Sequence, residues 1–155
     1  MIRYRYRRER GSLGKIARPV ANVILENDGL QVETSMYIDS GADVTMIPLR
    51  FGRALGLKQT ASDIIRELRG ISGSGIPYLL KEIVLILNGE KLTARIAWTL
   101  VEEVPLLLGR VDVFNQFQII FDERKGWVDF KKHGLKRDMS TFPNKRAKKR
   151  KPRSK

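Results

Sequence analysis

The stretch MYIDSGADV, residues 36–44, places a carboxylate (Asp39), a hydroxyl (Ser40) and a glycine (Gly41) between apolar residues. Such a triplet alone is common in turns. Here the apolar flanks predict that Asp39 leaves the end of a largely buried strand, where a charge without partners is costly. A fold keeps a carboxylate there when another group hydrogen-bonds it or uses it. Gly41 permits a tight turn, and its bare backbone lets a second group come close.

The other residue types restrict the chemistry to carboxylates. The chain has no cysteine, which excludes thiolate nucleophiles and thiolate metal sites, and its one histidine, His133, adjoins the basic C-terminal segment. A histidine metal site would lack partners. The adjacent acids Glu102 and Glu103 are typical of a solvated loop. The glycines of residues 70–75 lack the Lys-Ser/Thr of a phosphate loop. No metal and no cofactor is therefore expected.

Charge is divided unevenly along the 155 residues, whose formal net charge is +13. Residues 1–20 hold seven Lys and Arg against one acid, residues 131–155 hold twelve against one, and residues 21–130 hold eleven against fifteen. A mildly acidic body therefore carries two basic ends. The C-terminal end has too few apolar residues to fold alone and is expected to be disordered. It could bind nucleic acid or another polyanion, or serve only solubility.

The sequence indicates neither a secretory signal nor a membrane span. The N-terminus is basic but lacks the apolar segment of a secretory signal. No run of 18 apolar residues occurs, so no membrane span is expected. These features favour a soluble, cytoplasmic protein of one domain.

Short strands separated by turns predict a mostly-β barrel or sandwich with one or two short helices. The hairpin of residues 19–38, with ENDG at its turn, leads directly into Asp39. Further strands flank the glycine-rich stretch and the NGE turn, and a final hairpin covers residues 118–130. A short helix is expected after Pro48, and VPLLLG has the length of a buried strand.

Three segments in order resemble the retropepsin-like aspartic proteases, the single-domain relatives of retroviral proteases. YIDSGADVTMIP, residues 37–48, resembles their active-site segment; RGISGSGIP, residues 69–77, resembles their flap; and LLLGRVDVF, residues 106–114, resembles the segment before their short C-terminal helix. The resemblance implies a single-lobe closed β-barrel of the retropepsin type, functional as a symmetric homodimer. It divides the chain into a basic N-terminal extension (1–17), a protease domain (18–130) and a basic tail (131–155).

The resemblance also implies an activity, that of an aspartic endopeptidase acting on a peptide or protein substrate. One Asp-Ser-Gly triplet supplies one carboxylate, whereas the chemistry needs two that face each other. Two carboxyl groups a few ångströms apart share one proton, so that one acts as base toward a water and the other as acid. The sequence therefore predicts that Asp39 of each subunit meets its copy at a two-fold axis.

The remaining roles follow residue by residue from the resemblance. Ser40 matches the hydroxyl that hydrogen-bonds across the axis, Gly41 presents its backbone to the substrate, and Ala42 is the small residue of a pocket wall. Asp43 matches a position that holds the substrate backbone and pairs, within one subunit, with the arginine matched by Arg110.

The glycine-rich stretch is predicted to form the tip of the flap, with backbone amides that reach the substrate. Its residues are Ile71, Ser72, Gly73, Ser74 and Gly75. A plain hairpin turn is the alternative if Asp39 is not catalytic. The competing interpretation of the whole chain is a non-catalytic retropepsin-like binding module, recruited to nucleic acid by its basic ends.

Overall fold

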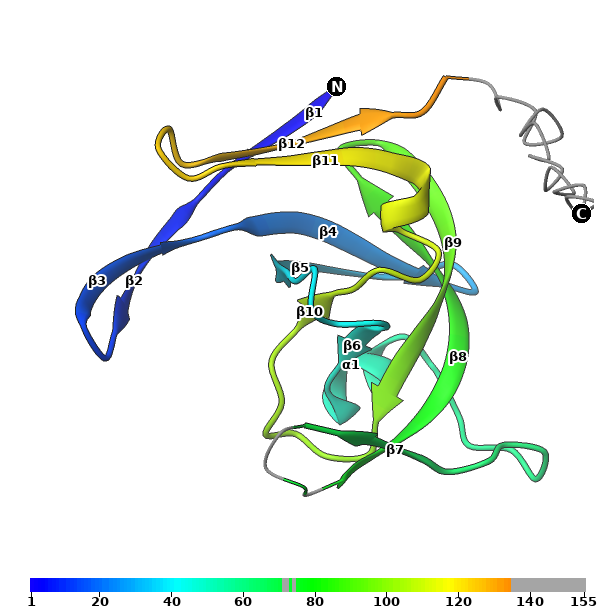
Figure 1. Cartoon of the computed structure of the whole chain (residues 1–155). Helices are drawn as coiled ribbons and strands as arrows, with labels where there is room; N and C mark the ends of the chain where they lie inside the picture. The colour runs from blue at the N-terminus through cyan, green and yellow to red at the C-terminus, as the bar shows by residue number, and fades with distance from the viewer. Residues whose placement is uncertain (71–72, 74, 135–155) are drawn as a thin grey trace, which may run out of the picture.

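A closed barrel of six strands forms the body of the protein, seen in a computed structural model that describes residues 1–70, 73 and 75–134 (Figure 1). The barrel strands are β4 (Val20–Asn27), β5 (Leu30–Ile38), β10 (Leu107–Leu108), β6 (Thr45–Ile47), β9 (Glu90–Thr99) and β8 (Gly75–Leu87). Each pairs with the next in that order, and β8 pairs again with β4 to close the ring. The expected mostly-β barrel is confirmed, with one short α-helix, α1 (Leu49–Ala54), and a 3-10 helix, η1 (Phe114–Gln116).

Two of the predicted hairpins form because their turns have the right backbone chemistry. The β4–β5 turn contains Asp28 and Gly29 at φ angles of +46° and +79°, and the β8–β9 turn contains Asn88 and Gly89 at +47° and +86°. Asp-Gly and Asn-Gly pairs with both φ angles positive are the favoured two-residue hairpin turns. The first of these turns fixes the register of β4 against β5. In that register Val20 lies opposite Tyr37, two residues before Asp39.

A second, three-stranded sheet of β1 (Ile2–Arg5), β12 (Trp127–Lys132) and β11 (Phe117–Asp122) lies beside the barrel, with β1 next to β4 (Figure 1). The final hairpin that the sequence predicted is β11–β12. Its core is aromatic: the Phe130 ring, fully buried, makes edge contacts with Tyr4 and Phe117.

The basic N-terminal segment, expected as an extension outside the protease domain, is part of the folded unit. Ile2 and Tyr6 are both only 7% exposed and belong to the hydrophobic core. Arginines alternate with apolar residues over positions 2–6, so a strand directs the apolar ones inward and the arginines to solvent. The high arginine content hid this alternation. The boundary expected after residue 17 therefore does not separate two packed units.

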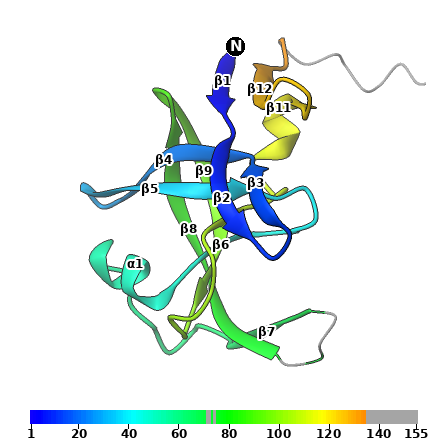
Figure 2. The same ribbon diagram turned by 90° about the vertical axis from the view of Figure 1, so that its left-hand side faces the viewer.

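An antiparallel pair of strands, β2 (Arg7–Gly11) and β3 (Gly14–Arg18), leaves the body between β1 and β4. These strands pair only with each other among the described residues, and they extend away from the barrel (Figures 1 and 2). We call residues 7–18 the arm.

The two sides of the predicted flap are present as β7 (Arg66–Arg69) and the start of β8, paired from Arg66 with Tyr78 to Arg69 with Gly75. Of the predicted tip, Ile71, Ser72 and Ser74 lie outside the described residues, as do residues 135–155 of the basic tail. Within the described ranges, none of the helices combines the length and the apolar character needed to span a membrane.

The two tyrosines of the N-terminal segment, Tyr6 buried and Tyr4 partly buried, should make the protein sensitive to alkali. Burial raises the pKa of Tyr4 to about 12, and burial together with a hydrogen bond to Glu123 raises the pKa of Tyr6 to about 12. A folded-state pKa above the unfolded value of about 10 means that stability holds below pH 10 and falls as pH rises toward 12. We expect the urea midpoint to fall in that window. The fall should be smaller in the Tyr4→Phe, Tyr6→Phe double variant, and an equal fall in both proteins would contradict a buried N-terminal segment.

Candidate active site

Asp39 stands where the sequence placed it, directly after β5. Ile38 before it is 4% exposed, whereas the Asp39 side chain is half-buried. The Asp39 N–H donates to the carbonyl of Leu108 at 3.1 Å, and the N–H of Gly41 donates to Oδ1 of Asp39 at 2.8 Å. Within the described part of the chain, Oδ2 accepts no hydrogen bond. The carboxylate is therefore held through one oxygen and open at the other.

The short strand β10 positions the loop of residues 39–44. Leu107 and Leu108 pair in parallel with Tyr37 and Ile38 of β5, and Leu107 also pairs antiparallel with Met46 of β6. β10 thus lies between the strand that enters the loop and the strand that leaves it. The buried strand predicted from VPLLLG is confirmed only in part, because the strand comprises Leu107 and Leu108 and only Leu108 is buried.

Gly109 and Thr45 close the loop beneath Asp39. The Gly109 N–H donates to Oγ1 of Thr45 at 3.0 Å, and Thr45 is fully buried. A Cβ atom at position 109 would lie 2.6 Å from the carbonyl oxygen of Val44, so the close approach of the two chains requires glycine there. The apolar-apolar-Gly pattern therefore reflects packing against the loop.

The outer half of the loop is bonded to the chain that follows Gly109. The N–H of Arg110 donates to the carbonyl of Ala42 at 3.0 Å, and the N–H of Val111 donates to the carbonyl of Asp43 at 2.8 Å. Ser40, Gly41 and Asp43 are exposed, and Ala42 is partly buried. The loop backbone is consequently fixed on one side, while the side chains that the sequence singled out face outward.

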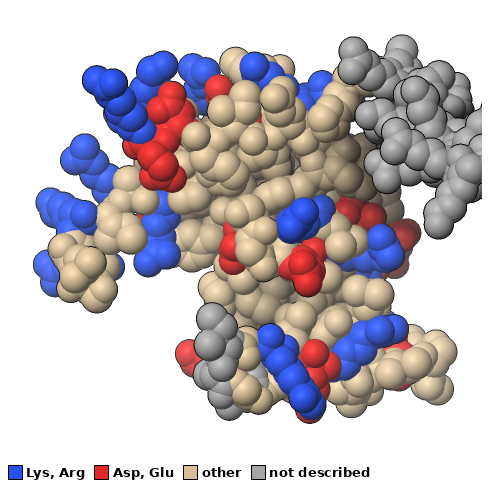
Figure 3. Space-filling view, viewed as in Figure 1, with Lys and Arg blue, Asp and Glu red and all other residues tan. Residues whose placement is uncertain are grey.

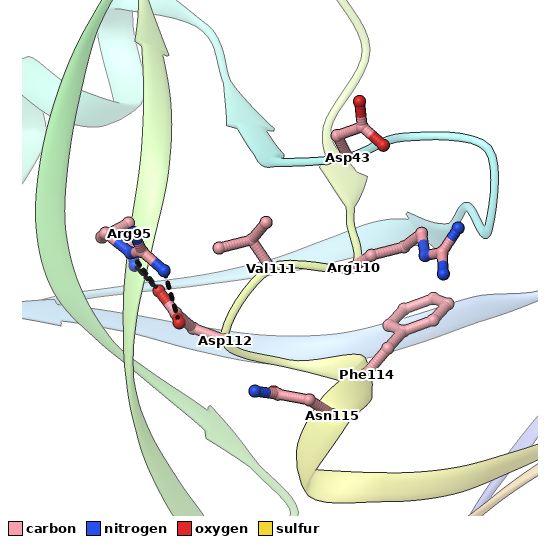
Figure 4. A pocket seen from close by; sticks show the side chains of 7 residues that line it. All are labelled: Asp43, Arg95, Arg110, Val111, Asp112, Phe114 and Asn115. Atoms are coloured by element: carbon pink, nitrogen blue, oxygen red, sulfur yellow. Dashed lines mark hydrogen bonds and ion pairs between the residues drawn. The ribbon is translucent and has the colours of Figure 1, made fainter. Parts of the chain in front are cut away.

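The predicted ion pair between Asp43 and Arg110 does not form in the single chain. Both side chains are exposed, and they lie apart at the rim of an open pocket (Figure 4). The described residues hold no ion pair between them within 4.0 Å. The segments of Asp43 and Arg110 are neighbours, as the predicted ion pair required. Backbone hydrogen bonds join them, whereas their side chains do not pair.

Arg95 of β9 and Asp112 form an ion pair in that pocket, and the sequence did not predict it. Nε of Arg95 lies 2.7 Å from Oδ2 of Asp112, Nη2 lies 3.0 Å from Oδ1, and the backbone N–H of Arg95 also donates to Oδ2 (Figure 4). The guanidinium, and then the backbone N–H, hold the pKa of Asp112 below its usual value. Only the strand pairing of the folded chain brings these two residues together.

A groove of about 480 Å³ lies beside Asp39, and the arm forms part of its wall. Glu9 and Arg18 of the arm line it together with Tyr37, Asp39 and Leu107. The sequence had assigned Glu9 to a separate extension, so its place beside Asp39 was missed.

Glu9 is the centre of a small polar cluster at the base of the arm. The Tyr37 hydroxyl donates to Oε2 of Glu9 at 2.8 Å, Arg7 lies 2.7 Å from Oε1, and Arg18 lies 3.4 Å from Oε2. The hydrogen bond from Arg7, and then that from Tyr37, hold the pKa of Glu9 below its usual value. These contacts attach the arm to β5 two residues before Asp39.

Of the residues predicted to form the flap tip, the structure describes Gly73 and Gly75. Gly73 and Gly75 are exposed, and Gly73 has a φ angle of +79°, which glycine adopts without strain. The N–H of Gly73 donates to the carbonyl of Gly70 at 3.1 Å.

No protein-family model matches the chain, and comparison with curated proteins gave no match. Comparison with solved structures gave the EIAV protease complexed with the inhibitor HBY-793, at a TM-score of 0.46 and 19% sequence identity. The match covers 60% of this chain and 82% of that chain. The function proposed below therefore rests on the geometry of this chain.

Removing the hydroxyl of Thr45 should loosen the loop. Thr45→Val keeps the shape of the side chain but leaves the buried Gly109 N–H without an acceptor, which costs about 1–3 kcal/mol of unfolding free energy. Thr45→Ser keeps the acceptor and is the matched control, with a smaller loss from the missing methyl group. Urea unfolding of the three proteins measures the difference, and equal stability of the two variants would show that the hydrogen bond does not hold the loop.

Proposed function

We propose that the chain is an aspartic endopeptidase whose active form is a symmetric homodimer with the two Asp39 carboxylates face to face. The observation that carries the proposal is the state of Asp39 in the single chain. Its backbone is fixed by Leu108, one carboxylate oxygen is held by Gly41, and the other oxygen accepts no hydrogen bond from the described residues. A rigid carboxylate with one open oxygen is what a two-carboxylate site needs from each half.

The two carboxyl groups would share one proton, because like charges about 3 Å apart cannot both ionise. The ionised group takes a proton from a water held between them, and the oxygen of that water attacks the carbonyl carbon of the peptide bond. The protonated group gives its proton to the carbonyl oxygen. Collapse of this gem-diol intermediate breaks the C–N bond. The carboxyl group that took the water's proton gives it to the leaving amine, and one hydroxyl of the intermediate passes its proton to the other carboxylate, which restores the singly protonated pair.

The exposed residues around Asp39 would supply the rest of the site. Ser40, which follows Asp39, is exposed, so its hydroxyl could hydrogen-bond the partner's loop. The exposed backbone of Gly41 and the small side chain of Ala42 would leave room for an extended peptide next to Asp39. The β7–β8 hairpin would cover that peptide from the opposite side. Asp43, without an ion pair in the described residues, remains available to a substrate amide.

The direct test is Asp39→Asn, which removes the ionisable oxygen and keeps the size of the side chain. We expect cleavage of a peptide library at pH 4–7 to fall at least a thousandfold, with folding and dimerisation retained. The reason is that the Asp39 carboxyl group donates or accepts a proton in every turnover. Asp28→Asn is the matched control, because position 28 has a φ angle of +46°, which asparagine tolerates. Equal cleavage by Asp39→Asn and the unchanged protein would refute the proposal.

A shared proton also predicts the pH dependence of the activity. The value of kcat/KM should follow a bell, because the acid limb requires one carboxylate to be ionised and the alkaline limb requires one proton to remain. The two apparent pKa values belong to the pair rather than to either residue. Initial rates between pH 3 and 8 at a protein concentration that keeps the dimer assembled measure the profile. A single sigmoid without an alkaline limb would indicate that no shared proton takes part.

A further inference from the structure

Beyond the contacts of its base with Tyr37, the arm (residues 7–18) pairs with no other strand of the described residues. Five residues of β2 pair with five of β3, from Arg7 with Arg18 to Gly11 with Gly14, which at about 3.3 Å per residue gives a ribbon roughly 15 Å long. Leu13 at its tip is 99% exposed. A lone two-stranded hairpin is only marginally stable in water, so a ribbon of this length is expected to pack against something.

The register divides the arm into two faces of different charge. Arg7, Glu9 and Arg18 share the inner face, where Glu9 pairs with both arginines and each guanidinium lies over the Tyr37 ring, at 5.5 and 5.8 Å. The outer face carries Arg8, Arg10 and Lys15. No acid of the described residues pairs with these three cations, and Figure 3 shows Lys and Arg side chains gathered over the arm, at the left.

The base of the arm lies beside the residue that would meet a second copy of the chain. Glu9 and Arg18 line the same groove as Asp39. If two Asp39 carboxylates meet at a two-fold axis, each arm base lies close to that axis, and each tip extends beyond the protein's own barrel (Figure 1). The face that presents Asp39 to the partner therefore also presents the arm.

We propose that each arm reaches across the two-fold axis and clasps the barrel of the partner subunit. This inference rests on the homodimer of the proposed function. Charge complementarity favours a second copy as the occupant, because residues 21–130 hold eleven Lys and Arg against fifteen acids while the outer face of the arm holds three cations. Leu13 contributes an apolar contact at the tip. The same contact would then stabilise the dimer and also fix the outer wall of the substrate groove.

The test compares three full-length proteins by sedimentation equilibrium over a range of concentrations and salt. The arm variant is Arg8→Ser, Arg10→Ser, Lys15→Ser, which leaves Glu9 and its contacts in place. The control is Arg53→Ser, Lys58→Ser, Lys131→Ser, which removes three exposed cations that have no ion pair in the described residues. We expect the dimer dissociation constant of the arm variant to rise about tenfold or more, and that of the control to stay unchanged.

A cross-linking measurement locates the arm independently of dimer strength. The chain has no cysteine, so Leu13→Cys creates a single attachment point for a thiol-reactive photo-cross-linker. Mixed dimers of ¹⁴N and ¹⁵N chains distinguish contacts between subunits from contacts within one. We expect cross-links that join ¹⁴N and ¹⁵N peptides, from position 13 of one chain to residues 20–130 of the other.

The outcomes separate the two proposals. A chain that remains monomeric at every concentration and cleaves no peptide would refute the proposed function, and the clasp with it. A dimer that cleaves peptides but shows only cross-links within one chain, or an unchanged dissociation constant in the arm variant, would refute the clasp alone. If the arm variant dimerises normally but binds a 30-nucleotide single-stranded DNA more weakly, the arm is a polyanion-binding element and the clasp is wrong.

Discussion

The loop that carries Asp39 depends on β10, a strand of two residues inserted between β5 and β6. A strand this short contributes few hydrogen bonds, each worth about 0.5–1.5 kcal/mol net. Its hold on the loop comes from burial: Leu108 and Thr45 are fully buried, and Gly109 approaches the Val44 backbone too closely for any side chain. A loosened β10 would release the Asp39 amide, the Ala42 carbonyl and the Asp43 carbonyl together.

The sequence predicted the elements whose signals are local. The turns at residues 28–29 and 88–89 contain the residue pairs that positive φ angles require, and alternation set the inner faces of the strands they join. The position of Asp39 at a buried strand end followed from its apolar neighbours in the same way. Local patterning therefore located Asp39, because β5 and the turn that follows it are encoded within ten residues, whereas β10, which holds the loop, comes from a distant part of the chain.

Contacts between distant segments were not predictable from those patterns. Arg95 and Asp112 meet only because β9 and the loop after Gly109 are neighbours in the folded barrel, whereas the expected pair of Asp43 and Arg110 is replaced by backbone hydrogen bonds. Net charge misled the interpretation of the N-terminus. Its arginines suggested an extension outside the domain, but the apolar residues between them supply Ile2 and Tyr6 to the core.

The arrangement of Asp39 explains why assembly, rather than local structure, would create the catalytic chemistry. In one chain Asp39 is only half-buried, and water solvates an exposed charge well. A second copy would remove that water and place the two carboxyl groups face to face. The free energy of subunit association would then also set the proton affinity of the pair. An arm that clasps the partner beside this groove would then act on catalysis without touching the substrate, by holding the two carboxyl groups at the distance where they share one proton.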